Sequence, residues 1–222
     1  MPKIFLDYGH GGTDPGAVVG DYKEKDFNLK IGLRVAYHLK RHQQTVVESR
    51  INDTTMSLSE RSSKANNNNV DICVSLHCNS FSQNSAQGLE TYYYNGSVKG
   101  KNLAGKIQNS IINAKLYSKN RGLKTDNLYM TREVKAPAVL VEMGFISNDT
   151  DRGYLSKTED MAIAIAKGIL DYWEIPFDNE SSKNSSDKLY KVQVGAFKEK
   201  ANADRLKQEL RTKGYNSFIV EV

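Results

Sequence analysis

Apolar residues recur along most of the chain in two alternating patterns. Short apolar runs that are typical of buried strands lie near residues 3–7, 44–49, 71–77, 89–94 and 138–142. Apolar positions with a helical period predict helices near residues 25–41, 57–68, 98–115 and 159–173. Strands that alternate with helices in this way predict an α/β fold, with a mostly parallel sheet flanked by helices on both faces.

The helix predicted at 25–41 carries an apolar stripe of Phe27, Ile31, Val35 and Leu39. Glu24 falls on the stripe side if the helix extends back to it. A carboxylate that points toward a core is unfavourable unless a partner compensates its charge. A helix cap or an ion pair is the ordinary explanation, and a functional role is the alternative.

The helical pattern ends after Trp173, and residues 178–187 contain no apolar side chain. We therefore expect a domain at 1–174, a polar linker at 175–187 and a small C-terminal unit at 188–222. Apolar residues alternate at Tyr190–Val194 and again at Phe218–Val222, on either side of a helical stretch near 199–213. This pattern predicts one βαβ unit.

Composition adds few constraints. The 222 residues are 26% charged and have a mean hydropathy of −0.57, and no run approaches the ~18 apolar residues of a membrane span. The net charge of +5 is modest, so we expect no nucleic-acid partner.

Cys73 and Cys78 are an odd number of residues apart on one predicted strand and should face opposite sides of the sheet. We expect two free thiols in a reducing compartment.

The first predicted strand leads into a glycine-rich loop, KIFLDYGHGGTDPGA. A dinucleotide-binding fingerprint would need glycine where Asp14 stands. A phosphate-binding P-loop would need Lys and then Ser or Thr after its last glycine, where Ala17 and Val18 follow Gly16. Neither phosphate motif fits, and the loop instead presents His10.

A second histidine, His77, ends the predicted strand in VSLHCNS. Ligands bind at the carboxyl ends of strands in open α/β sheets. Two histidines and one carboxylate, His10, Glu24 and His77, are a ligand set of catalytic zinc that leaves a position for water. Glu142 ends the apolar run of PAVLVEMGF and is a candidate to transfer the proton of that water. Taken singly, His77 could be a core histidine and Glu142 could pair with a Lys or Arg.

The stretches DYGHGGTDPGA, EKDFNL, VSLHCNS, RGLKTDNLYMTRE and PAVLVEMGFISN occur in this order. Over about residues 1–174 the chain resembles the zinc-dependent N-acetylmuramoyl-L-alanine amidases of bacterial autolysins and phage endolysins. The resemblance implies that His10, Glu24 and His77 bind one zinc ion and that Glu142 is the catalytic glutamate. The implied reaction is hydrolysis of the peptidoglycan amide between N-acetylmuramic acid and the L-alanine of the stem peptide. Asn79 and Arg121 are candidate substrate contacts, although Arg121 could simply hold a turn.

The C-terminal unit resembles half of a SPOR-type peptidoglycan-binding domain, which has two βαβ halves packed as one sheet. We therefore expect residues 188–222 to bind the cell wall, to join two chains as a homodimer, or both. A zinc peptidase that cuts within the stem peptide and a non-catalytic wall-binding protein stay open as alternatives.

The first residues, Met-Pro-Lys and then Ile4–Leu6, lack the apolar core of a secretory signal. We expect a cytoplasmic protein that a holin or cell lysis releases to act on the wall. The sequence does not distinguish a phage lysin from a host autolysin.

Overall fold

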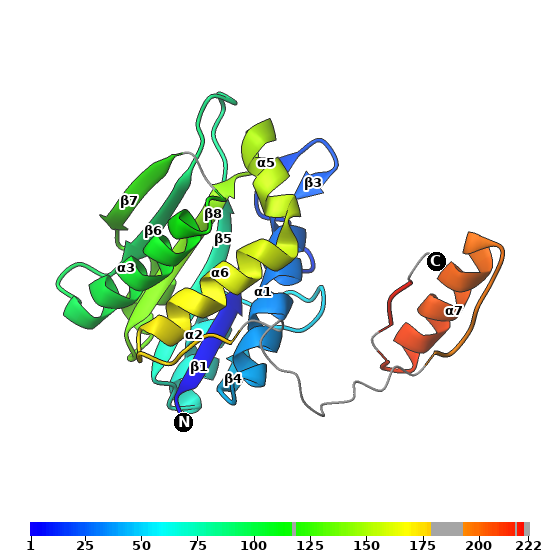
Figure 1. Ribbon diagram of the computed structural model, residues 1–222, viewed down its shortest axis with the longest axis horizontal. Helices are drawn as coiled ribbons and strands as arrows, with labels where there is room; N and C mark the ends of the chain where they lie inside the picture. Colours follow the sequence, from blue (N-terminus) through cyan, green and yellow to red (C-terminus); the bar gives the residue numbers. More distant parts are fainter. Residues whose placement is uncertain (117–118, 179–192, 216, 220–222) are drawn as a thin grey trace. The chain divides into compact units, whose positions relative to one another are not determined.

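A six-stranded sheet forms the middle layer of the first unit of the chain in the computed structural model, which describes residues 1–116, 119–178, 193–215 and 217–219. The strands across the sheet, in order, are β4 (Thr45–Glu48), β1 (Lys3–Tyr8), β5 (Ile72–Asn79), β8 (Ala138–Phe145), β6 (Leu89–Tyr93) and β7 (Asn120–Thr125) (Figure 1). The first four strands are parallel to one another, β6 is antiparallel to β8, and β7 is parallel to β6. A small hairpin of β2 (Val18–Val19) and β3 (Tyr22–Lys23) follows the glycine-rich loop.

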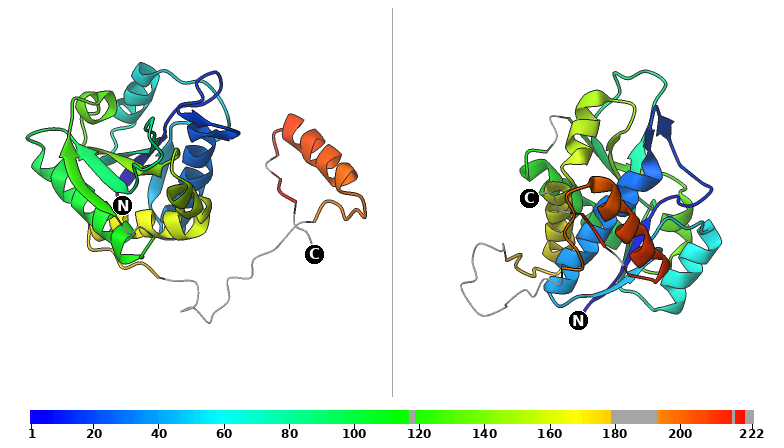
Figure 2. Two further views of the ribbon diagram at one scale, coloured as in Figure 1. Left: turned by 90° about the horizontal axis from the view of Figure 1, so that it is seen from above. Right: turned by 90° about the vertical axis from the view of Figure 1, so that its right-hand side faces the viewer.

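Helices cover both faces of this sheet, as the sequence predicted (Figure 2). One face is covered by α1 (Glu24–Arg41), α3 (Val98–Asn113) and α6 (Thr158–Asp171). The other face carries α2 (Leu58–Asn67) and α4 (Tyr129–Glu133), and α5 (Asp149–Ser156) follows β8. The predicted stripe of α1 faces the larger core, where Ile31, Val35 and Leu39 are fully buried. The strict alternation along β5 separates the free thiols of Cys73 and Cys78 into the two cores, as expected.

Several elements were not predicted. The β2–β3 hairpin, α4 and α5 are short, and β7, which has six residues, lies at an edge of the sheet with Leu123 as its one apolar residue. An edge strand packs few side chains, so its hydrophobic pattern is weak. Arg121 consequently lies in a strand, where the sequence indicated a loop.

Residues 175–178 differ from their assignment to a linker. Ile175 and Phe177 pack against the larger core, and the Phe177 ring stacks on His42 with 4.5 Å between centroids. The backbone N–H of Asp178 donates to Nε2 of His42 over 3.0 Å. The first unit of the chain accordingly comprises Met1–Asn179, whereas most of the expected linker, 179–187, lies outside the described residues.

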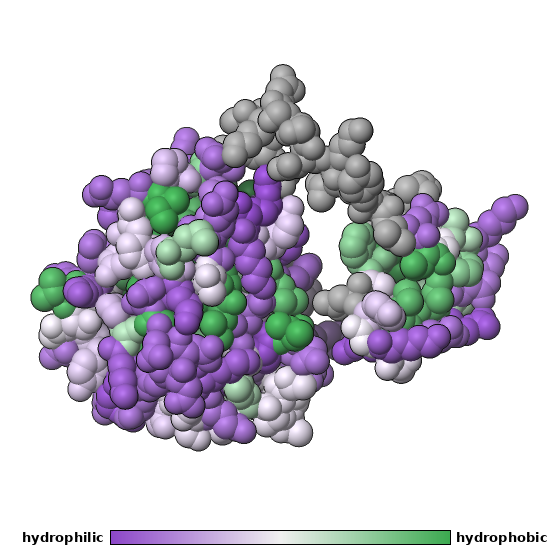
Figure 3. Space-filling model, turned by 90° about the horizontal axis from the view of Figure 1, so that it is seen from below, coloured by the Kyte–Doolittle hydropathy of each residue, from purple (hydrophilic) through white to green (hydrophobic). Residues whose placement is uncertain are grey.

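The second unit, Glu180–Val222, contains α7 (Lys200–Thr212) at the position of the predicted helix. Most of the expected tail strands, including Tyr190, Val192, Val220 and Val222, lies outside the described residues, and residues 193–195 and 218–219 form no strand. None of the described residues of this unit is buried. Hydrophobic side chains gather on the face of the unit seen in Figure 3, and the exposed ones are Val194, Phe197, Tyr215, Phe218 and Ile219.

Within the described parts of the chain, no helix has both the length and the apolar character that a membrane crossing requires.

The contact between α3 and α6 depends on a glycine. A Cβ atom at Gly168 would lie 2.6 Å from Cα of Ile107, whereas a Cβ at Gly105 would meet nothing closer than 3.8 Å. Alanine favours a helix interior over glycine by ~1 kcal/mol. Gly168→Ala should nevertheless destabilise the fold by roughly 1–3 kcal/mol through overpacking, and Gly105→Ala should leave stability unchanged or raised. Denaturant unfolding of both variants checks this, and equal stability of the two would contradict the packing.

Candidate metal centre

Three segments that are far apart in the sequence meet at the carboxyl end of the sheet. His10 follows β1, Glu24 begins α1 and His77 lies near the end of β5, and one ligand atom from each lies within 4.8 Å of the others. Nε2 of His10 is 3.2 Å from Oε2 of Glu24, and Nδ1 of His77 is 2.9 Å from Oε1 of the same carboxylate. The fold therefore brings together the three residues that the sequence proposed as metal ligands.

The glycines of the loop make room for this cluster. A Cβ atom on Gly9 would lie 2.2 Å from the His77 ring, and one on Gly16 would lie 2.6 Å from Oε2 of Glu24. His10 itself has a φ of 61°, a left-handed conformation that is uncommon for a residue with a side chain. The loop is thus shaped for close approach of two imidazoles and a carboxylate.

Two residues that the sequence analysis did not single out hold His10 in place. Oδ2 of Asp14 is 2.8 Å from Nδ1 of His10, which leaves Nε2 directed at Glu24. The buried guanidinium of Arg61 donates to the carbonyl oxygen of His10 over 2.8 Å and to Oδ1 of buried Asp7 over 2.7 Å. The sequence held one signal for the role of Asp14, namely its position four residues after His10 in the same loop. Nothing in the sequence marks the pairing of Arg61 with Asp7.

The charges of the cluster are tightly coupled. Burial alone would raise the pKa of Glu24, but hydrogen bonds with His10 and His77 outweigh it and hold that pKa well below its usual range. Burial would lower the pKa of His10, but hydrogen bonds with Glu24 and Asp14 raise it to about 9. The pKa of His77 is likewise raised, because the bond with Glu24 outweighs burial.

Glu142 lies next to His77 in the register of β5 and β8. Its Oε2 atom is buried and has no hydrogen-bond partner among the described residues. Burial raises the pKa of Glu142 to about 7, partly offset by the positive charge of His77. A carboxyl group that is not tied up and titrates near neutral pH suits proton transfer.

The two candidate substrate contacts both bind Glu90, a buried carboxylate that the sequence analysis did not single out. Nδ2 of Asn79 donates to Oε1 of Glu90 over 2.9 Å, and Nε of Arg121 donates to Oε2 over 2.5 Å. Oδ1 of Asn79 also accepts the backbone N–H of Ser80. Glu90 was missed because a charged residue on a strand ordinarily faces solvent, and nothing in the neighbouring sequence indicates that this one is buried.

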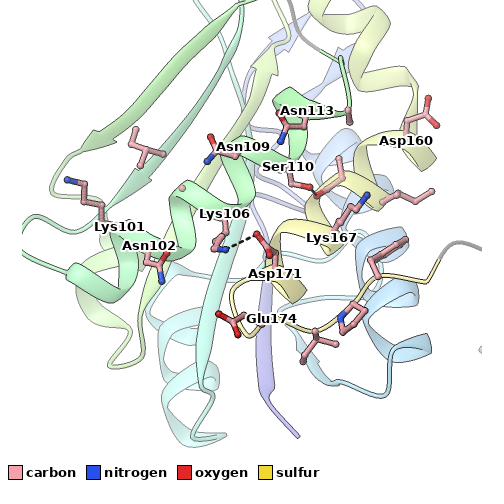
Figure 4. A pocket seen from close by; sticks show the side chains of 18 of the residues that line it. Lys101, Asn102, Lys106, Asn109, Ser110, Asn113, Asp160, Lys167, Asp171 and Glu174 are labelled. Atoms are coloured by element: carbon pink, nitrogen blue, oxygen red, sulfur yellow. Dashed lines mark hydrogen bonds and ion pairs between the residues drawn. The ribbon is translucent and has the colours of Figure 1, made fainter.

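A cavity of about 1100 Å³ forms a groove along α3 and α6 (Figure 4). Lys106 and Asp171 form an ion pair across it. These helices cover the face of the sheet opposite the side chains of His77 and Glu142, so the groove is separate from the cluster. A smaller cavity of about 470 Å³, lined by Val18, Phe81 and Ser147 among others, lies between the β2 segment and the loop after β5.

The fold and the site together define a class of enzyme. A cluster of two histidines and one carboxylate at the strand ends, with a free buried carboxylate beside it, is the arrangement of a metal-dependent hydrolase. The chain belongs to the N-acetylmuramoyl-L-alanine amidase family, whose sequence model matches residues 4–171. The SPOR domain model matches residues 186–222.

Individual relatives agree with this family. The sporulation-specific N-acetylmuramoyl-L-alanine amidase of Bacillus subtilis (strain 168) is 38% identical over 223 residues, covering 99% of this chain and 85% of the relative. The catalytic domain of the amidase CwlV from Bacillus (Paenibacillus) polymyxa var. colistinus is similar in structure, with a TM-score of 0.75 and 33% identity over 79% of this chain and all (100%) of that domain. The amidase of Clostridium difficile 630 gives a TM-score of 0.74 and 34% identity over 78% of this chain and 97% of that one.

The protons of the cluster make metal affinity depend on pH. Since the pKa of His10 is raised to about 9 in the metal-free protein, a metal ion must displace that proton at lower pH. Below this pKa, Zn²⁺ affinity should fall by about tenfold per pH unit for the His10 proton alone, and His10→Gln should remove that part of the slope. Competition titrations against a chromophoric chelator between about pH 6 and 8 measure this, and a flat profile would contradict it.

Proposed function

We propose that this protein hydrolyses the amide between N-acetylmuramic acid and the L-alanine of the stem peptide in peptidoglycan, with a bound zinc ion. The observation that carries the proposal is the pairing of the His10, Glu24 and His77 cluster with an unpartnered carboxylate oxygen of Glu142 on the neighbouring strand. The family match supports the choice of bond.

The donor set fits zinc. Two imidazole nitrogens and one carboxylate oxygen converge, and neither Cys73 nor Cys78 is in the cluster. Asp14 fixes the ring of His10 through the other nitrogen, as carboxylates behind zinc-binding histidines do. Bound there, zinc would polarise the scissile carbonyl and acidify a water molecule.

Glu142 moves the proton. Its Oε2 would accept a proton from the attacking water and then deliver it to the nitrogen of the leaving L-alanine, so that the group ends each cycle unprotonated. The pKa of about 7, raised by burial, balances the two halves of this transfer. Asp14 holds the ring of His10 during the cycle through Nδ1, and Arg61 holds the loop that carries His10.

A zinc peptidase acting within the stem peptide would use the same cluster. Digestion of purified muropeptides followed by mass spectrometry distinguishes the two activities, because each leaves a different pair of masses. We expect intact stem peptides with a free L-alanine amino group, together with the sugar fragment that carries a free lactyl carboxylate. Peptides cut between amino acids, with the lactyl amide intact, would show the peptidase activity instead.

We further propose that the C-terminal unit binds peptidoglycan and joins two chains. Its described residues include no buried core, and Val194, Phe197, Tyr215 and Phe218 are exposed. Burying a face of this kind is favourable at ~25 cal/mol per Å², and a unit of this size rarely covers its own apolar surface. A two-fold pair would provide the cover and bring Val194, Leu206, Leu210 and Phe218 of both chains together, with Val192 and Val220, which lie outside the described residues.

Glu142→Gln tests the proton transfer. The amide is close in shape to the carboxyl but does not accept a proton, so the rate should fall by roughly 10²-fold or more while zinc stays bound. Muropeptide turnover and metal analysis of the same sample measure both quantities. Glu133→Gln, an exposed change on α4, is the matched control and should keep full activity. Loss of zinc from the Glu142 variant would show that Glu142 is a metal ligand.

Light scattering tests the pairing of chains. The full chain should be a dimer at micromolar concentration, and a truncation ending at Asn179 should be a monomer that still cuts soluble muropeptides. A monomeric full chain, or a truncation that remains dimeric, would refute this part of the proposal.

A further inference from the structure

The row of charged residues at the site continues past Glu142 to the edge of the sheet. His77 pairs with Glu142, Glu142 pairs with Glu90, and Glu90 pairs with Gly122 on β7. Neighbouring strands lie ~4.8 Å apart, so β7 runs roughly 10 Å from Glu142. Figure 1 shows β6 and β7 at this edge of the sheet.

Glu90 organises two cations there. Its side chain is 2% exposed, and Oε2 accepts hydrogen bonds of 2.5 Å from both Nε of Arg121 and Nζ of Lys124. Oε1 accepts from Asn79 and from the hydroxyl of Tyr92, each over 2.9 Å. Burial would raise the pKa of Glu90, but the bonds from Lys124 and Arg121 outweigh it and lower that pKa, so the group is a carboxylate.

A β-bulge makes this arrangement possible. Residues 121 and 124 of a regular strand would point to opposite faces. The register between β6 and β7 shifts between Leu89 and Glu90, and Gly122 has a φ of 80°. Arg121 is the extra residue of this bulge, and its side chain therefore points to the same carboxylate that Lys124 contacts. Bulges that redirect side chains in this way are frequent next to active sites.

The group of Glu90, Arg121 and Lys124 has a net positive charge. Two cations share one carboxylate, and their side chains are 27% and 36% exposed, for Arg121 and Lys124. Among the described residues, the two terminal nitrogens of Arg121 have no hydrogen-bond partner. Both oxygens of buried Glu90 accept hydrogen bonds. On the solvent side, Arg121 and Lys124 still offer positively charged hydrogen-bond donors.

We propose that Arg121 and Lys124, positioned by Glu90, bind a free carboxylate of the stem peptide. The inference rests on the proposed function. In the uncut substrate the lactyl carboxyl is consumed in the scissile amide, so a free carboxylate lies on the peptide side. An extended peptide spans at most ~3.3–3.6 Å per residue, and two to four residues beyond the scissile amide cover the distance from Glu142 to β7. The pair thus selects acidic stem peptides and sets the direction in which the peptide lies.

Two synthetic muramoyl peptides test the proposal, one with free carboxylates and one with every carboxylate converted to a primary amide. A charge-assisted bond of this kind corresponds to roughly 10-fold to 100-fold in kcat/KM, so the wild type should prefer the acidic peptide by that factor. Lys124→Met should lose most of the preference, mainly through a higher KM for the acidic peptide. Lys99→Met, an exposed lysine on α3, is the control and should keep the preference.

Glu90→Gln tests the positioning role. If Glu90 positions the two cations, this variant should also lose the preference for the acidic peptide. That preference is the ratio of the two kcat/KM values, which a general loss of folded protein does not change. Equal kcat/KM of the wild type for both peptides, or an unchanged preference in Lys124→Met, would overturn the inference while leaving the amidase activity intact. So would a Lys124→Met variant that only relieves inhibition by N-acetylmuramic acid, because the pair would then bind the product carboxylate. Failure to cut either peptide would overturn the proposed function itself.

Discussion

The carboxylate of Glu24 is the point on which the site depends. A buried ionised group is costly unless donors surround it, and here the donors come from all sides: the backbone N–H groups of Ala17 and Cys78, the side-chain amide of Asn28, and the rings of His10 and His77. Satisfying this one group fixes the glycine-rich loop, the start of α1 and the end of β5 relative to one another. The metal centre follows from that constraint.

The sheet places the remaining chemistry by register. Strict pairing across β5, β8 and β6 sets His77, Glu142 and Glu90 side by side on one face. Each of these groups is ionisable, and each has a different environment. His77 and Glu24 each stabilise the charged form of the other. Burial raises the pKa of Glu142, whereas hydrogen bonds from Lys124 and Arg121 lower that of Glu90. One row of the sheet thereby carries groups suited to metal binding, to proton transfer and to substrate positioning.

The sequence predicted the parts of the fold that have strong local patterns. The apolar stripe of α1 and the buried runs of β1, β5 and β8 were found because both cores impose a regular period on them. The edge strand β7 and short α4 carry little such pattern and were missed. The cluster was predictable because His10, Glu24 and His77 each interrupt an apolar or glycine-rich context. Arg61, Glu90 and Lys124 act through partners that are distant in sequence, which no local pattern reveals, whereas Asp14 lies only four residues after His10.

The central claim is that His10, Glu24 and His77 hold a zinc ion while Glu142 stays free of it. Anomalous scattering at the zinc absorption edge, from crystals of the zinc-loaded full chain, tests this most directly. The account predicts one peak at ~2.0–2.2 Å from a nitrogen of each histidine and an oxygen of Glu24, with both oxygens of Glu142 outside that range. A peak elsewhere in the chain, or a Glu142 oxygen bound to the metal, would contradict it.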